Sequence, residues 1–451
     1  MERSIGLKYV TLLMAICLSS VGIYFTDSVL MNIIYFCVLP IIAVVLVRGD
    51  LAHPYTWYSI VYTLYAIGYP VTYLFESTYD IYIYTKSLML VQIIALSIIL
   101  VIVGPTRISF HKNVFKLAFE KRNKTLFYVV LILVSMSVLE VIFKGYSHKV
   151  QIYEQGSPIV QIGFRVILLL MIIYAINQTI TFIKNEKFNN KELFAFILIT
   201  FGIFYYSGER DLFLRGLIVI LFLYYIFSAK QKINLLTIIM GISSLLLIPL
   251  MAKFKYFGLT GNVSKSDGNF LLSLFNSEFA SASKNLQIIL LSEYNSYFGG
   301  QSYIWGIIRG LNLDSIFTAP SIMSWYNSTF FEENRAGQGF SILAEGYLNN
   351  GYSGIVFIAV SIGLIMKLLY RTSKINVYFF VYYLSAIPIF MYSLRADLAN
   401  LLTPLIGQNL LFLVLLLIFN SLSREFKIIT KRKNKSKQVI VLEKVGKCGE
   451  S

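Results

Sequence analysis

Long apolar stretches, separated by short polar segments, repeat along nearly the whole chain. Each stretch is about 20 residues long, which is the length that an α-helix needs to cross roughly 30 Å of hydrocarbon. Twelve of them lie at residues 7–25, 29–47, 55–75, 87–104, 125–143, 164–183, 192–207, 212–228, 234–251, 353–369, 375–393 and 402–420. The pattern predicts an all-α, polytopic integral membrane protein with about 12 transmembrane helices.

One long interruption breaks this pattern between the ninth and tenth spans. It divides the chain into residues 1–251 with nine helices, a loop at 252–350, residues 351–420 with three helices, and a basic tail at 421–451. Apolar residues recur at helical spacing in the first half of the loop, with Ser, Lys and Glu between them. We therefore expect short helices there that lie on the membrane surface.

Composition excludes an ordinary soluble protein, because 57% of the residues are apolar and only 14% are charged. Lys and Arg exceed Asp and Glu, for a net charge of +16, and 26 of the 39 basic residues fall in alternate connecting segments and the tail. Basic residues concentrate on the cytoplasmic side. This predicts that both termini are cytoplasmic and that the 252–350 loop lies outside; the basic tail is expected to contact water or anionic lipid, not nucleic acid.

Several charged residues border the predicted spans, where charge is costly. Glu140, Arg165, Arg210, Arg215 and Arg395 all fall at the predicted outer ends. A guanidinium presents a planar fork to two oxygens, so this distribution suits a phosphate or diphosphate at the membrane surface. The alternative is a structural role in ion pairs, such as Glu140 with Arg165 or Arg395 with Asp397.

Two aromatic segments of the loop also carry amides. These are Tyr294–Gly300, with the sequence YNSYFGG, and Trp325–Asn327, with the sequence WYN. An aromatic face beside amide groups suits a sugar, although packing at a membrane interface explains such residues as well.

The end of the loop carries a motif that identifies a resemblance. The run RAGQGFSILAEGYLNNG extends from Arg335 to Gly351, SGERD forms the Ser207–Asp211 turn, and LRADL covers Leu394–Leu398. Together with the many spans and the long late loop, these segments resemble the Wzy-type polymerases, which join lipid-linked oligosaccharide repeat units of bacterial O-antigen or capsule. Some members of that family carry Arg and Gly sixteen residues apart in two outer loops; here Arg335 and Gly351 reproduce this spacing once.

The resemblance implies a fold similar to membrane glycosyltransferases of the GT-C type, located in the bacterial cytoplasmic membrane. The implied substrate is a polyprenyl-diphosphate-linked oligosaccharide, and a chain-length regulator and a flippase are implied partners beside the membrane lipid. An O-antigen ligase and a flippase or transporter for lipid-linked sugar are the alternatives. The absence of similar halves in the sequence disfavours a transporter.

Such a transfer requires neutralisation of the leaving diphosphate and removal of a proton from the attacking hydroxyl. We assign Arg210, Arg335 and Arg395 to the diphosphate, with Arg165 and Arg215 behind them. Glu345 is the candidate for the base or for orienting the acceptor, with Glu209 next, and a helix cap is its structural alternative. The remaining substrate-binding candidates in the Arg335–Gly351 run are Gly337, Gly339, Ser341 and Tyr347.

A metal site is not expected from this sequence. Glu209 and Asp211 have the spacing of an acidic pair, but Arg210 between them opposes cation binding. His53, His111 and His148 form no cluster of ligands along the sequence. We therefore expect neither a metal nor another cofactor.

Overall fold

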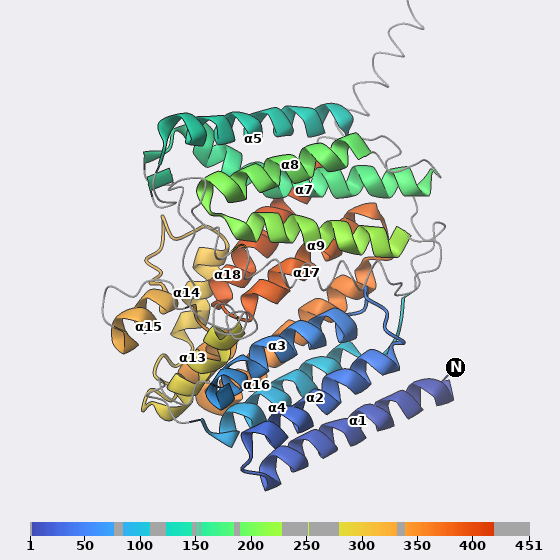
Figure 1. The fold of residues 1–451 in the computed structure, drawn as a ribbon, viewed down its shortest axis with the longest axis vertical. Helices are drawn as coiled ribbons and strands as arrows, with labels where there is room; N and C mark the ends of the chain where they lie inside the picture. Colours follow the sequence, from blue (N-terminus) through green and yellow to red (C-terminus); the bar gives the residue numbers. More distant parts are fainter. Residues whose placement is uncertain are drawn as a thin grey trace, which may run out of the picture. The chain divides into compact units, whose positions relative to one another are not determined.

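The computed structural model describes residues 2–75, 84–108, 123–146, 151–152, 155–184, 190–227, 251, 279–331 and 339–418. Every regular element in these ranges is a helix (Figure 1), which confirms the all-α prediction for this part of the chain. The α-helices are α1 (Glu2–Phe25), α2 (Val29–Leu46), α3 (Pro54–Phe75), α4 (Lys86–Val103), α5 (Lys124–Lys144), α7 (Pro158–Ile183), α8 (Asn190–Ser207), α9 (Arg210–Phe227), α13 (Ala280–Leu291), α14 (Gln301–Gly310), α15 (Ile322–Phe330), α16 (Ile342–Thr372), α17 (Val377–Ser393) and α18 (Leu398–Leu402). A π-helix at Thr403–Leu410 follows α18.

Seven of the described helical segments are long and apolar enough to cross a membrane. They are Ile5–Phe25, Val29–Leu46, Lys86–Val103, Lys124–Lys144, Pro158–Ile183, Ile342–Thr372 and Leu398–Ile418. The chain is thus a membrane-embedded protein by these helices, and α3, α8, α9 and α17 also coincide with predicted spans. The total of twelve stays a prediction, because residues 234–250 of the ninth span lie outside the described residues, as does the basic tail.

The helices of residues 1–409 pack in two groups. One contains α1–α4 with α13 and α16, and the other contains α5 and α7–α9 (Figure 1). Helix α17 contacts α3 and α16 of the first group and α7 and α9 of the second. Its Tyr383 accepts a hydrogen bond from Trp57 Nε1 of α3 at 3.1 Å. Residues 410–451 form a separate unit, of which only 410–418 are described.

Helix α13 differs from the expected surface helix. It is largely buried, and it packs against α3, α16 and α4. Gly68 of α3 allows this approach, because a Cβ atom there would lie 2.4 Å from the carbonyl carbon of Phe279 at the start of α13. The amphipathic pattern was interpreted as a face toward lipid, but the apolar face of α13 instead meets other helices.

Helix α16 consists of two helices that meet at a sharp break. Asn350 and Gly351 have non-helical backbone angles, and Gly351 has φ +59°. The break brings Gly346 and Gly354 into backbone contact, and a Cβ atom on Gly354 would lie 1.9 Å from the Gly346 carbonyl oxygen. Residues 342–349 are therefore a separate short helix, and the apolar part begins after Gly351, close to the predicted start of the tenth span.

At the opposite end of these helices, a buried carboxylate joins three parts of the chain. Asp50, between α2 and α3, accepts hydrogen bonds from Arg107 Nε at 3.3 Å and from the Tyr225 hydroxyl at 3.5 Å. Arg107 follows α4, and Tyr225 lies near the end of α9. The structure thus places three of the connections that carry the predicted cytoplasmic charge at one common end.

His53 lies in the same region and is fully buried as a neutral imidazole. Its Nδ1 accepts the Tyr55 amide hydrogen at 3.1 Å, which leaves the hydrogen on Nε2 to donate to the Thr106 carbonyl at 3.2 Å. Burial lowers the pKa of His53 to about 3, and the Thr106 carbonyl opposes this shift. Protonation would place a second hydrogen against the Tyr55 amide.

This histidine predicts a pH dependence of stability. The unfolded chain takes up the proton near pH 6.5, whereas the folded protein does so only near pH 3. Between these values the unfolded state binds more protons, so the free energy of unfolding contributed by His53 falls as pH decreases from 6.5 toward 3. In detergent, the melting temperature of His53→Gln should approach that of the wild type as pH decreases. Parallel curves would contradict the prediction.

Candidate functional site

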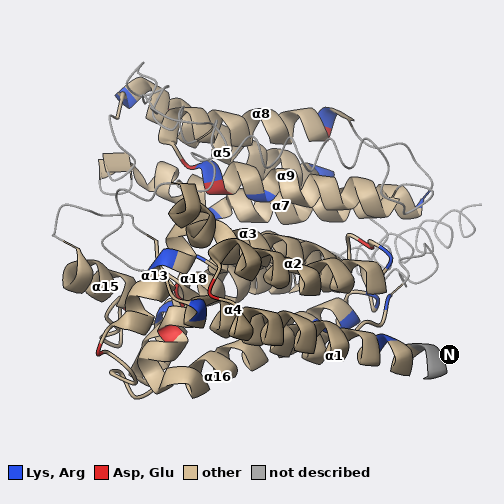
Figure 2. Ribbon diagram, turned by 60° about the horizontal axis from the view of Figure 1, so that its bottom comes forward, with Lys and Arg blue, Asp and Glu red and all other residues tan. Residues whose placement is uncertain are grey.

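Charged residues are sparse along the described helices and gather toward their ends (Figure 2). One such region joins two of the sequence motifs. The Phe340 amide donates to the Arg395 carbonyl at 3.0 Å, and the Leu398 amide donates to Glu345 Oε2 at 2.7 Å. Gly339 has φ +73°, a backbone conformation that favours glycine. The segments 339–349 and 394–398 therefore form one structural unit.

Arginines from two elements meet at the ring of Tyr392, at the end of α17. The guanidinium carbon of Arg215 lies 5.5 Å from the ring centroid, and that of Arg395 lies 5.4 Å from it. Both distances are typical of cation–π contacts. Nε of Arg215 is buried without a hydrogen-bond partner. The two guanidiniums thus share one aromatic ring as their neighbour.

The first turn of α9 belongs to the same cluster. The Tyr392 hydroxyl donates a hydrogen bond to Asp211. The charges of Arg395, Asp211 and Arg210 act on the hydroxyl group of Tyr65 in α3. We call Arg210, Asp211, Arg215, Tyr392 and Arg395 the arginine cluster. It contains three guanidiniums and one carboxylate, and the positive end of the α9 backbone dipole adds to this charge.

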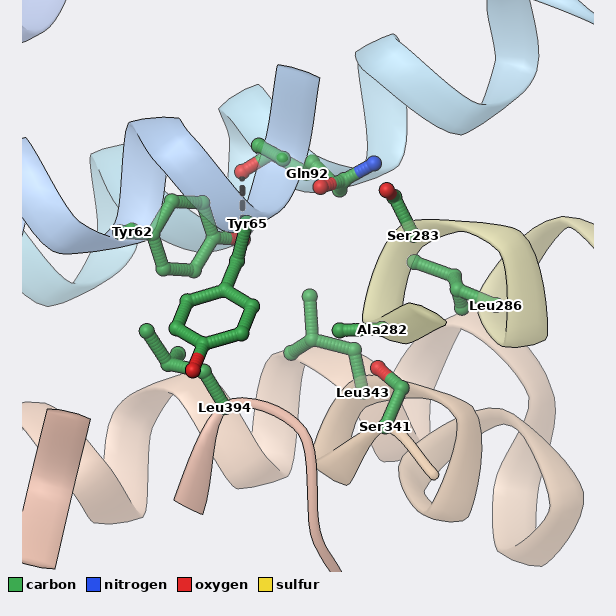
Figure 3. Close-up of a pocket in the computed structure, with 10 residues that line it drawn as sticks. Tyr62, Tyr65, Gln92, Ala282, Ser283, Leu286, Ser341, Leu343 and Leu394 are labelled. Atoms are coloured by element: carbon green, nitrogen blue, oxygen red, sulfur yellow. Dashed lines mark hydrogen bonds between the residues drawn. The ribbon is translucent and has the colours of Figure 1, made fainter. Parts of the chain in front are cut away.

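A small pocket adjoins the arginine cluster at Tyr65. Figure 3 shows Gln92 and Ser283 on one side of it, Ser341 on another, and the Tyr65 hydroxyl beside Leu394. The Gln92 side chain is almost fully buried, and its Nε2 has no hydrogen-bond partner. The other lining residues are Tyr62, Ala66, Ala282, Leu286 and Leu343. The pocket therefore combines apolar walls with neutral polar groups, one of which lacks a partner in the protein.

Glu345 lies beside this region, but it is enclosed by protein. The residue is 1% exposed. Its Oε1 accepts a hydrogen bond from the Ser302 hydroxyl at 2.8 Å, and its Oε2 accepts one from the Leu398 amide. Asn349, one turn later, donates to Ser302 Oγ at 2.6 Å and accepts from the Gly300 amide at 3.1 Å. The carboxylate therefore links α16, α14 and α18, and its bond to Leu398 caps the N-terminus of α18.

The ion pairs differ from those considered as alternatives. Asp397 pairs with Arg309 of α14 at 3.4 Å, and its Oδ1 caps α18 through the Asn400 amide. Glu140 pairs with Lys144 at 3.0 Å, one turn along α5. The alternative ion pairs, Arg395 with Asp397 and Glu140 with Arg165, are not the ones that these carboxylates form, because partners on other elements or one turn away lie closer.

The remaining candidates are placed as follows. Arg165 is exposed on α7. Among the described residues, no hydrogen bond, ion pair or ring contact joins it to the arginine cluster. Tyr347 is buried and packs edge-on against Tyr352. Ser341 lines the pocket. Arg335 and Gly337 lie outside the described residues. Within the described ranges, no three His, Cys, Asp or Glu side chains gather as metal ligands would.

Sequence analysis did not single out Tyr65, Gln92 or Tyr392. Gln92 carries a usable signal, since an amide inside an apolar span is costly without a partner. Tyr65 and Tyr392 carry none, because they are two of 32 tyrosines.

Comparison with known proteins finds no match to this chain, whether among family models, curated proteins or solved structures.

The network around Glu345 predicts a difference between two adjacent asparagines. Asn349→Ala leaves the half-buried Gly300 amide and the buried Ser302 amide without their acceptor, which should lower the free energy of unfolding by about 1–3 kcal/mol. Asn350→Ala is the matched control, because Asn350 is exposed. Thermal unfolding of the purified proteins in detergent should show a lower midpoint for Asn349→Ala alone. Equal midpoints would contradict the assigned role of Asn349.

Proposed function

We propose that the protein is a membrane glycosyltransferase that joins polyprenyl-diphosphate-linked oligosaccharide repeat units into surface polysaccharide, O-antigen or capsule, at the outer face of the bacterial cytoplasmic membrane. The observation that carries this proposal is the placement of Arg215 and Arg395 at the ring of Tyr392, beside the pocket that Gln92 lines. Arg210 begins the helix that carries Arg215, and its charge acts on Tyr65 of the same pocket. An anion with several oxygens would offset the repulsion among these guanidiniums. A diphosphate has that character.

The reaction assigns a task to each part of this arrangement. The bond between the donor sugar's anomeric carbon and the diphosphate oxygen breaks, and a hydroxyl of the acceptor repeat unit forms the new glycosidic bond. The arginine cluster stabilises the charge that develops on the leaving diphosphate. The pocket is small, and its neutral groups, at Gln92, Ser341 and Tyr65, suit a single hydroxyl of the attached sugar (Figure 3).

The proton of the attacking hydroxyl requires a carboxylate near the leaving group. Asp211 lies within the arginine cluster, whereas both oxygens of Glu345 are occupied and the side chain is enclosed. We therefore assign proton removal to Asp211 and a positioning role to Glu345, which fixes the segment carrying Arg395. Glu345 as the base remains the alternative from the sequence. Arg335, outside the described residues, remains a further candidate for the diphosphate.

Diphosphate binding tests the arginine cluster directly. Arg215→Ala and Arg395→Ala should each weaken binding of inorganic diphosphate to the purified full-length protein by roughly tenfold or more, as expected for loss of a charge-assisted hydrogen bond. Lys at either position should restore binding only in part, since it lacks the planar fork. Arg371→Ala, at the exposed far end of α16, is the control for removal of one positive charge. Isothermal titration calorimetry measures the affinities.

The same variants should fail to lengthen lipid-linked repeat units in detergent, an assay that needs neither nucleotide sugar nor an ion gradient. A flippase would form no new glycosidic bond in this assay. Unchanged diphosphate affinity and polymer formation in both alanine variants would refute the assignment.

The outer location predicts a labelling pattern. In a chain lacking Cys17, Cys37 and Cys448, a cysteine at exposed Ser324 of α15 should react with an impermeant maleimide added to intact cells. A cysteine at exposed Lys374, after α16, should react only after permeabilisation, because its segment carries the predicted cytoplasmic charge. The reverse pattern would place the arginine cluster on the cytoplasmic side.

A further inference from the structure

The two aromatic segments of the loop form one cluster. The ring of Tyr297 stacks on Trp325 with centroids 5.4 Å apart and an interplanar angle of 23°. Tyr294 and Phe298 meet Trp325 edge-on, at 5.4 Å and 4.8 Å. Tyr297 is 57% exposed, whereas Phe298 is 8% exposed. We call Tyr294, Tyr297 and Trp325 the aromatic platform.

The loop that carries Tyr297 is held in an unfavourable conformation. Ser296 has φ +56°, which costs a non-glycine residue roughly 1 kcal/mol or more. Two backbone hydrogen bonds hold the loop to the helix that contains Glu345: the Ser296 amide donates to the Tyr347 carbonyl at 3.3 Å, and the Phe298 amide donates to the Leu348 carbonyl at 2.9 Å. Tyr297 is therefore fixed with most of its ring toward the surroundings.

Polar groups lie next to the platform. Asn295 and Ser296 are exposed neighbours of Tyr297 in the chain. A sugar ring has one face of C–H groups and a rim of hydroxyls. The C–H face packs on an aromatic ring, and the hydroxyls bond to amides.

We propose that the aromatic platform binds a neutral sugar ring of the acceptor glycan, with Tyr297 under the ring and Asn295 at its hydroxyls. The inference rests on the proposed function, since it supplies the acceptor for the same reaction. The contact with Tyr347 and Leu348 places this surface on the helix of Glu345, whereas the arginine cluster binds the diphosphate elsewhere. Fixing the ring in advance reduces the entropy cost of binding.

Binding of oligosaccharides, prepared by partial hydrolysis of the host's own surface polysaccharide, tests this proposal. Saturation-transfer NMR with the full-length protein in lipid nanodiscs should detect binding to the wild type. Tyr297→Ala should weaken it roughly fivefold to tenfold, as expected for one aromatic contact. Tyr297→Phe should retain binding, because it keeps the ring. Tyr24→Ala is the matched control, since Tyr24 is 59% exposed on α1.

Two further measurements separate this surface from the arginine cluster and from lipid contact. Tyr297→Ala should raise the KM for acceptor in the lengthening assay, with kcat and diphosphate affinity unchanged. Two outcomes would contradict glycan binding by the platform: equal glycan affinity in Tyr297→Ala and the wild type, or no glycan binding while diphosphate binding persists. Neither outcome would contradict diphosphate binding by the arginine cluster. If the arginine variants lose diphosphate binding but no form of the protein, the wild type included, lengthens the glycan, the result would instead contradict the proposed polymerase activity.

Fluorescence tests contact of the platform with lipid. In a Trp57→Phe, Trp305→Phe chain, Trp325 is the remaining tryptophan, and quenching of its fluorescence by brominated lipid would assign the platform to the membrane interface.

Discussion

The buried carboxylate of Glu345 depends on hydrogen bonds that replace the water it has lost. A carboxylate withdrawn from water is tolerated only where donors surround it. The Ser302 hydroxyl and the Leu398 amide supply them, from α14 and from the start of α18. Three separate stretches of chain must therefore be in place together, and Asn349 adds bonds that hold the start of α14 to the same helix.

The position of Arg395 follows from this requirement. The segment 394–398 is fastened at one end by the Phe340 amide and at the other by Glu345, so the backbone of Arg395 has little freedom. Its guanidinium reaches the same ring as Arg215. The surrounding fold thus holds two like charges at one ring, as in sites prepared for an anion.

Sequence patterns predicted the described helices well, because an apolar stretch of about 20 residues has few alternatives in a membrane. They also predict Arg210, Arg215 and Arg395 at the same ends of the spans, and in the structure Arg215 and Arg395 contact one ring. The sequence pattern could not predict the pairing of Asp397 with Arg309, because 88 residues separate them. The burial of α13 depended on Gly68, some 200 residues earlier, and the burial of Glu345 depended on donors from two distant segments.

The break at Asn350 and Gly351 has a mechanical consequence. The apolar helix after Gly351 can change its tilt when the bilayer becomes thinner or thicker, while the short helix before Asn350 keeps its bonds to α14 and α18. Helices adapt to hydrophobic mismatch by tilting, at a modest cost per ångström. A continuous helix would transmit that tilt to Glu345. The interruption removes this continuous path. The contacts that remain between the two parts are the packing of Gly346 on Gly354 and the hydrogen bond from the Tyr303 hydroxyl of α14 to the Gly354 carbonyl.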